Sequence, residues 1–293
     1  MISILIPIYN QNAVGLVKGL QSQCEKLGIQ FQILVFDDLS KEEFREQNRP
    51  LGHLFGVSYL ELSENLGRAK IRNRLARTAR FKHLLFIDGD SEIIRDDYIQ
   101  SYLDHIDQAE IVYGGREYQK EKPSDRKKVL HWKYGVKREA LPLEKRVMDP
   151  YLNFQSNNFM ITAGLFEKLK FDENVKGYGY EDLLFAQKIK DVEARILHID
   201  NPVLHAGLED ADAFIEKTKN ACKNLALLNK SGQLEETRLT RFYEKMKALG
   251  LKGIMVKYYR SNSAAIHRNL TSANPSIGKF NLMKFAEYDG QLI

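Results

Sequence analysis

The chain has 293 residues, of which 43% are hydrophobic and 28% charged, which suits one large domain or a domain with an appendage. No run of 18 apolar residues occurs, and no basic segment precedes an apolar run at the N-terminus. We therefore expect neither a membrane-spanning helix nor a secretory signal. The two cysteines lack metal-ligand spacing and should be reduced thiols, which favours the cytoplasm.

Short apolar runs alternate with amphipathic stretches through the first 115 residues. The apolar runs predict strands at 3–8, 31–36, 57–62, 83–87 and 110–115. The amphipathic stretches predict helices at 12–28, 67–80 and 98–106. This alternation predicts an α/β fold, Rossmann-like, with a mostly parallel sheet and helices on both faces. Ligands of such sheets bind at the carboxyl ends of the strands.

The chain after residue 208 has a different character. Residues 116–150 are rich in charge and predict a long loop or a pair of helices, and 153–208 are compact again. Residues 209–293 predict a basic, α-helical C-terminal extension beside a first domain at 1–208. The last 60 residues carry ten Lys/Arg and five Asp/Glu, which accounts for the whole net charge of +5. Such helices either dock on an anionic membrane surface or pack on the first domain, whereas no motif indicates nucleic-acid binding.

The segment Asp88-Gly89-Asp90 follows the predicted strand at 83–87. Two carboxylates two residues apart can hold a hard divalent cation such as Mn²⁺ or Mg²⁺, and the glycine between them lets a ligand approach the backbone. The alternative is an acidic turn, because Asp and Gly are common in turns.

A second acidic pair, Asp37-Asp38, follows the strand at 31–36 and could bind a base or a ribose, or cap the next helix. Arg72 lies in the basic stretch 64–80 and could reach phosphates, although most cations there must be solvated. His205 suits a third ligand of Mn²⁺ beside carboxylates, with His198 and His131 as competitors.

The stretch GYGYED contains Tyr178, Tyr180, Glu181 and Asp182 directly before an apolar helix. Tyrosine faces can stack on a sugar, and a carboxylate can accept a proton from a hydroxyl. Acidic residues at a helix start are also stabilised by the helix dipole, which is the alternative explanation.

In this order the motifs resemble the family-two glycosyltransferases, which have the GT-A fold. The resemblance covers about residues 1–208 and is carried by SILIPIYN, VFDDLS, ENLGRAKIRN, LLFIDGD and FDENVKGYGYEDLLF. It implies that Pro7 and Tyr9 line a nucleotide pocket, that Asp38 binds the base and that Arg72 lies near the nucleotide. It implies further that Asp88 contacts the ribose or a metal-bound water, that Asp90 binds the metal and that His205 completes its ligands.

The resemblance also implies that Asn157 and Asn158 lie near the transferred sugar and that Asp182 is the base, with Glu181 beside it. The implied activity is inverting transfer of one hexosyl or N-acetylhexosaminyl group from a nucleotide sugar, usually UDP-linked. The implied acceptor is a glycan or a lipid-linked oligosaccharide in cell-envelope polysaccharide assembly, at the inner face of the membrane. The alternatives are a Mg²⁺-dependent phosphohydrolase of haloacid-dehalogenase type and a non-catalytic glycan-binding protein. Leu39 stands where the family usually has glycine, which leaves the geometry of that turn open.

Overall fold

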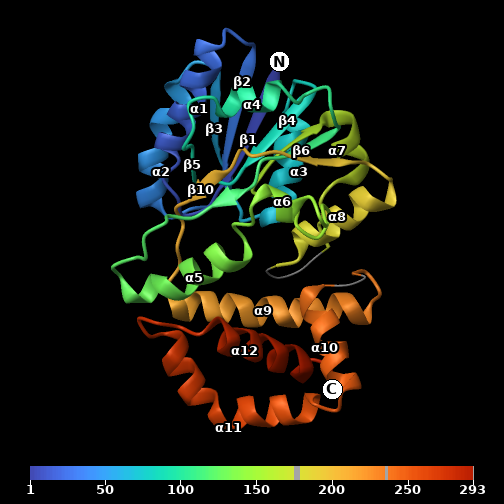
Figure 1. Ribbon diagram of the computed structural model, residues 1–293. Helices are drawn as coiled ribbons and strands as arrows, with labels where there is room; N and C mark the ends of the chain where they lie inside the picture. The colour runs from blue at the N-terminus through green and yellow to red at the C-terminus, as the bar shows by residue number, and fades with distance from the viewer. Residues whose placement is uncertain (175–178, 235–236, 293) are drawn as a thin grey trace. The chain divides into compact units, whose positions relative to one another are not determined.

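The computed structural model describes residues 1–174, 179–234 and 237–292. Within these residues it contains a seven-stranded sheet with the order β3-β2-β1-β4-β8-β6-β9 (Figure 1). The strands are β1 (Ile2–Ile8), β2 (Phe31–Asp37), β3 (Val57–Glu61), β4 (His83–Ile87), β6 (Ile111–Tyr113), β8 (Asn158–Thr162) and β9 (Ile196–His198). All neighbouring pairs are parallel except those of β8, which runs antiparallel to β4 and β6.

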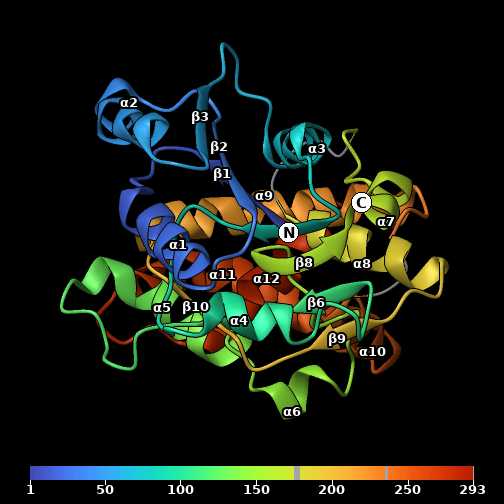
Figure 2. The ribbon, with the colours of Figure 1, turned by 90° about the horizontal axis from the view of Figure 1, so that it is seen from above.

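Both faces of this sheet are buried, which explains why its strands are continuous apolar runs rather than alternating ones. One face packs on α1 (Val14–Lys26) and α4 (Tyr98–Leu103). The other face packs on α3 (Arg68–Thr78), α7 (Ala163–Leu169) and the later turns of α8 (Glu181–Asp191). The view in Figure 2 shows these two sets of helices on opposite sides of the strands, as predicted.

A second, three-stranded sheet has the order β5-β10-β7 and consists of β5 (Ser91–Glu92), β10 (Val203–His205) and β7 (Arg116–Glu117). Its register pairs His205 with Ser91, the residue that follows the Asp88-Gly89-Asp90 turn. Shorter elements complete this unit: α2 (Glu42–Asn48), η1 (Arg49–His53) and α6 (Leu143–Arg146). The small sheet therefore fixes which side chains lie beside Asp90.

The remaining helices form a separate compact unit that contains 119–139, 179–184 and the chain from 208 onward. Its elements are η2 (Arg126–Lys128), α5 (Val129–Arg138), α9 (Ala211–Lys230), α10 (Arg238–Ala248), α11 (Lys252–Leu270) and α12 (Ile277–Gly290). Its core joins Leu130 of α5, Phe214 of α9 and Phe280 of α12. The predicted boundary at residue 208 is one border of this unit, and another falls inside α8, after Leu184.

A search of the described helices for a segment long and apolar enough to cross a bilayer found none.

Candidate active site

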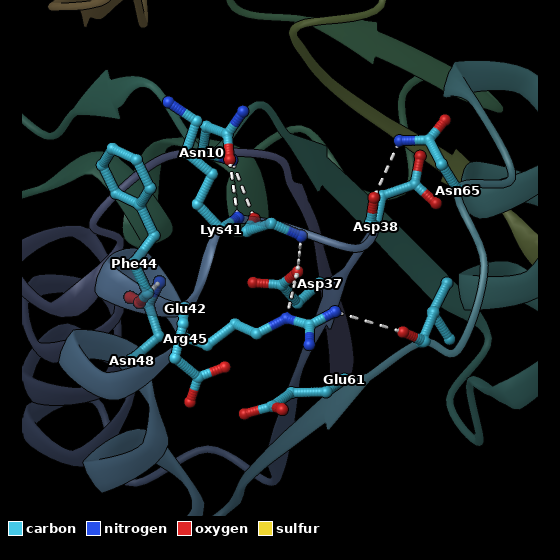
Figure 3. Close-up of polar contacts among 12 residues, drawn as sticks. Asn10, Asp37, Asp38, Lys41, Glu42, Phe44, Arg45, Asn48, Glu61 and Asn65 are labelled. Atoms are coloured by element: carbon cyan, nitrogen blue, oxygen red, sulfur yellow. Dashed lines mark hydrogen bonds and ion pairs between the residues drawn. The ribbon is translucent and has the colours of Figure 1, made fainter.

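The first acidic pair lies at the carboxyl end of β2 and is bound mainly by backbone groups (Figure 3). The Asp38 carboxylate accepts hydrogen bonds from the N–H groups of Leu66 and Gly67, at 2.6 and 2.9 Å. The Asn65 side chain donates to the Asp38 carbonyl at 2.8 Å. Burial raises the pKa of Asp38 and outweighs the opposite effect of the two N–H donors. Asp38 thus holds the start of α3 against the end of β2.

Asp37 stabilises the turn that follows it. Its buried carboxylate accepts from the Ser40 N–H at 2.6 Å and from the Tyr59 hydroxyl at 3.2 Å, and Arg45 Nε lies 3.9 Å away. Leu39 between these groups has a φ of +66°, in the left-handed region that favours glycine. The leucine therefore adopts the conformation for which the family usually has glycine.

The loop after β1 is joined to this turn. The Asn10 side-chain oxygen accepts from the Lys41 N–H at 2.9 Å, and the Asn10 N–H donates to Ser40 Oγ at 2.7 Å (Figure 3). Tyr9, directly after β1, is 55% exposed, and Pro7 is half-buried within the strand. An exposed aromatic ring therefore stands beside the Asp38 turn at the sheet edge where ligands of α/β proteins bind.

Asp88 lies among arginine side chains. Arg72 Nη2 donates to Asp88 Oδ1 at 2.6 Å, and the Arg72 side chain is only 4% exposed. Arg116 Nη2 lies 3.6 Å from Asp88 Oδ2. Arg116 was missed by sequence reasoning because it lies on a two-residue strand, whose position depends on pairing with residues near 203. Arg72 was predicted to lie near the nucleotide, and in the structure its side chain binds the Asp88 carboxylate.

Asp90 and His205 lie together, with Asp90 Oδ1 at 3.4 Å from His205 Nδ1. Burial opposes ionisation of Asp90, but His205, Arg116 and Arg68 outweigh it and hold the pKa of this carboxyl below its ordinary value. Of the three predicted metal ligands, Asp90 and His205 adjoin, whereas the Asp88 carboxylate faces Arg72. No group of three such ligands is preassembled within the described ranges.

Two glycines allow close packing around the Asp88-Gly89-Asp90 turn. A Cβ on Gly89 would lie 2.4 Å from Ile8 Cγ2, so only glycine lets the acidic turn pack on the end of β1. A Cβ on Gly207 would lie 2.7 Å from Asp90 Oδ2, so the absence of a side chain there lets the backbone at 207 lie close to the carboxylate. A carboxylate and an imidazole that lie side by side are a pair of donors that fits a divalent cation.

The two predicted sugar-binding asparagines have different surroundings. The Asn158 amide accepts from the hydroxyls of Tyr98 and Tyr102 and donates to the carbonyls of Gly115 and Asn201. These four bonds occupy the amide fully, so Asn158 orders the strands rather than presenting a group to a sugar. Asn157 is only 2% exposed, and neither its side-chain oxygen nor its nitrogen has a hydrogen-bond partner among the described residues.

The competing histidines have structural surroundings. His198 Nε2 donates to the Pro150 carbonyl at 3.0 Å, and the ring packs edge-on against Tyr113, while burial lowers the pKa of His198 to about 4. His131 Nδ1 accepts from the Glu209 N–H at 2.9 Å, in the helical unit, and its ring stacks on Phe214. Only His205 of the three lies beside one of the predicted metal-binding carboxylates in the part of the chain that the structure describes.

The GYGYED stretch belongs to the helical unit as far as it is described. Tyr178 lies outside the described residues. Tyr180 has a φ of +72° and directly precedes α8, and Glu181 and Asp182 form the first turn of that helix, both half-buried.

The sequence model of a protein family described as "Glycosyl transferase family 2" matches residues 3–169, which is more than half of the chain. The chain belongs to glycosyl transferase family 2. The matched residues include both acidic pairs, Arg72 and the two asparagines, so the resemblance predicted from the motifs is confirmed for this part.

Curated relatives of this family-two chain align with it only in part of their own length. An "Uncharacterized glycosyltransferase" of Haemophilus influenzae is 33% identical over 90 residues, 31% of this chain and 29% of the relative. A "Putative inactive polypeptide N-acetylgalactosaminyltransferase 12" of Drosophila melanogaster is 25% identical over 291 residues, 87% of this chain and 48% of the relative. The chain thus spans less than half of either protein.

Solved glycosyltransferase structures share the fold. A mannosyltransferase from Pyrobaculum calidifontis, in complex with GDP-Man and Mn²⁺, superposes with a TM-score of 0.55 at 13% identity, covering 97% of this chain and 85% of the other. TarS of S. aureus in complex with UDP-GlcNAc has a TM-score of 0.52 at 16% identity, covering 99% and 90%. The predicted GT-A fold is therefore confirmed for this family-two member.

Proposed function

We propose that the protein is an inverting, metal-dependent glycosyltransferase that moves one sugar from a nucleotide-sugar donor to a hydroxyl of an acceptor. The observation that carries the proposal is the Asp90–His205 contact of 3.4 Å, just after the end of β4. An ionised carboxylate and an imidazole nitrogen form a donor set for Mn²⁺ or Mg²⁺. The Mn²⁺ bound by the similar mannosyltransferase supports the same choice.

The nucleotide would bind along the edge formed by Pro7, Tyr9 and Asp38. An ionised carboxylate has about four acceptor positions, and Asp38 uses two of them for backbone N–H groups. The others can accept from a base such as uracil, and Tyr9 offers an exposed ring for stacking. UDP-GlcNAc in TarS and GDP-Man in the mannosyltransferase support a nucleoside diphosphate sugar, with UDP as our first choice.

The residues around Asp90 would hold the diphosphate. Asp90 and His205 would hold the cation, and Arg72 fixes Asp88, which would contact the ribose or a metal-bound water. Arg116 adds a positive charge that acts on both carboxylates. When bound, Mn²⁺ or Mg²⁺ would neutralise negative charge on the departing diphosphate.

The transfer itself would use Asp182. The acceptor oxygen attacks the anomeric carbon, and the bond from that carbon to the phosphate oxygen breaks, with its electron pair leaving on the nucleoside diphosphate. The hydroxyl proton passes to the Asp182 carboxylate. One displacement inverts the configuration at the anomeric carbon. Asn157, Glu181 and Tyr180 would surround the sugar or the acceptor, and the saturated amide of Asn158 would support Asn157 from the same strand end.

Two measurements test this proposal. A screen of UDP-, GDP- and dTDP-sugars with Mn²⁺ or Mg²⁺ should give nucleotide release for one donor class. Asp182→Asn should then lower turnover by about 10²- to 10⁴-fold and leave donor binding intact. Asp191→Asn, an exposed carboxylate at the other end of α8, is the matched control and should behave as wild type.

The same screen separates the alternatives. A phosphohydrolase of haloacid-dehalogenase type is not favoured by the family match, and would release phosphate from simple phosphoesters. A non-catalytic glycan-binding protein would bind a donor or glycan without release, an outcome that the inactive Drosophila relative makes worth testing. Wild-type turnover in Asp182→Asn would refute the assignment of Asp182 as the base.

For the acceptor, we propose a glycan or lipid-linked oligosaccharide reached at an anionic membrane surface on the cytoplasmic side. At the turn between α10 and α11, Leu249, Leu251, Ile254 and Tyr258 are exposed. Lys245, Lys247 and Lys257 are exposed around them. Such a mixture suits the headgroup region of anionic lipids, where each Lys or Arg adds about 1 kcal/mol.

Vesicle co-sedimentation tests the membrane contact. Full-length protein should sediment with vesicles containing phosphatidylglycerol and not with pure phosphatidylcholine, and Ile254→Asp should weaken this binding. Phe55→Asp, an exposed apolar residue outside the α10–α11 turn, is the control. Equal sedimentation of Ile254→Asp and wild type would contradict the contact.

A further inference from the structure

We infer that Asn224 of α9 is a positioning residue for transfer, because it fixes the backbone that carries Glu181 and Asp182. The inference rests on the proposed role of Asp182 as the base. It assigns to the helical unit a part in the reaction that neither the family match, which ends at residue 169, nor the sequence motifs assign.

The contact is a hydrogen bond between distant parts of the chain. Asn224 Nδ2 donates to the Gly179 carbonyl at 2.9 Å, and the asparagine is buried although it lies in the middle of a twenty-residue helix. A buried amide in a helix interior is unfavourable unless it is satisfied. The bond to Gly179 accounts for its nitrogen.

The backbone at Gly179 and Tyr180 requires such support. The φ values are +92° and +72°, so two successive residues occupy the left-handed region directly before α8 begins. This conformation is unfavourable for tyrosine and persists where the surroundings hold it.

Helix α9 also approaches Gly179 at the residue one turn before Asn224. A Cβ on Gly179 would lie 2.9 Å from the Cβ of Ala221, and residues 221 and 224 share one helix face. Ala221 and Asn224 together thus set where the Gly179 backbone lies.

The position of Gly179 is transmitted to the base through Tyr180. The Tyr180 carbonyl accepts from the Leu184 N–H at 3.0 Å, which makes Tyr180 the cap of the helical turn that contains Asp182. Burial raises the pKa of the Tyr180 phenol, and the charged or titratable groups that act on it, Lys284, Cys222, Tyr134 and Tyr288, belong to the helical unit. A displacement of 179–180 would therefore displace the first turn of α8, and an error of about 1 Å in a reacting group can lower turnover by about 10²-fold.

The test removes the hydrogen bond from Asn224 to Gly179 without changing the size of the side chain. Asn224→Asp presents an oxygen to the Gly179 carbonyl, and Asn220→Asp makes the same substitution at an exposed position of the same helix. Turnover is measured as release of UDP or GDP from the donor that the screen identifies. Binding is measured by calorimetry with UDP or GDP and Mn²⁺.

We expect Asn224→Asp to lower kcat by about tenfold, with the dissociation constant for the Mn²⁺–nucleotide within about twofold of wild type. Asn220→Asp should match wild type in both. In an Asp182→Asn background, Asn224→Asp should cause no further loss, because the two residues act through one group. A loss of equal size in that background, or equal turnover of the two α9 variants, would overturn the inference.

Two further measurements keep the outcomes distinct. If Asn224→Asp fails to bind nucleotide and unfolds at a lower temperature than wild type, Ala221→Val tests the same contact by crowding Gly179. Wild-type turnover in folded Ala221→Val protein would overturn the inference. Wild-type turnover in Asp182→Asn alone would instead refute the base assignment.

Discussion

Two acidic pairs lie at the ends of the two strands that flank β1 in one sheet, and their carboxylates have different surroundings. Asp37-Asp38 follows β2 and Asp88-Gly89-Asp90 follows β4, on either side of β1. The first pair accepts hydrogen bonds from backbone N–H groups and from a tyrosine hydroxyl. The second pair lies among Arg72, Arg116 and His205. Carboxylates that cap backbone groups stabilise a turn, whereas carboxylates bound by cationic side chains form a charged cluster that can bind a ligand.

The largest expected effect is at the second pair. Asp90→Ala should lower turnover on the order of 10³-fold, because it removes the carboxylate that would hold the cation against the diphosphate. Calorimetry should show that Mn²⁺-dependent binding of UDP or GDP is lost. Asp96→Ala, an exposed aspartate nearby in the chain, should retain both. Unchanged Mn²⁺-dependent binding in Asp90→Ala would refute the cation site.

A substitution in the first pair, Asp37-Asp38, should lower the free energy of unfolding. Asp37→Ala leaves the Ser40 N–H and the Tyr59 hydroxyl without their acceptor and should lower the free energy of unfolding by about 3 kcal/mol. Urea denaturation measures this change. Asp97→Ala removes an exposed ion pair with Arg95 and should change the free energy of unfolding much less than Asp37→Ala does. Equal losses for the two variants would show that Asp37 does not build the turn.

A smaller effect, and of opposite sign, is expected from a substitution of Leu39. Leu39→Gly removes the steric conflict of a left-handed leucine and should raise the free energy of unfolding by about 0.5–1 kcal/mol. The leucine is exposed, so little burial is lost. Leu39→Ala trims the side chain but keeps a Cβ, and should bring no such gain. A less stable Leu39→Gly protein would contradict this account of the turn.

The smallest effect concerns pH. The pKa of Asp38 in the folded protein is raised above its ordinary value of 3.8, so the native state holds this proton more tightly than the unfolded chain. The resulting stabilisation is complete below that value and is lost as pH rises through the folded pKa. Urea denaturation between pH 4 and 6 should therefore give a shallower fall of stability for Asp38→Asn than for wild type. A steeper fall would refute the direction of the shift.

The sequence predicted the sheet well, because buried parallel strands are apolar runs, and it predicted that both acidic pairs follow such runs. The resemblance implied that His205 is a partner of Asp90, and the two side chains are in contact. The sequence could not predict that Arg72 and Arg116 bind Asp88, since these contacts depend on tertiary packing and on a two-residue strand. Nor could it distinguish the saturated Asn158 from the unsatisfied Asn157, which are adjacent and chemically identical.

The attachment of GYGYED to the C-terminal helices was also beyond sequence reasoning. The predicted domain boundary at 208 followed a change in composition, whereas 179–184 belong with the later helices. The contact that joins them links Asn224 to a residue 45 positions earlier, and no local pattern of apolar residues indicates it.

A substitution of Gly207 should inactivate the proposed cation site at Asp90 and His205 without removing any of its side chains. The φ of Gly207 is not in the left-handed region, so the backbone tolerates alanine there, and a single methyl would press on the Asp90 carboxylate and its Cβ. A Gly207→Ala protein would keep every carboxylate, arginine and histidine of the site, yet the added methyl would push the Asp90 carboxylate from its place beside His205. Such a protein should bind UDP or GDP with Mn²⁺ more weakly than wild type, although every proposed ligand of the cation is still present.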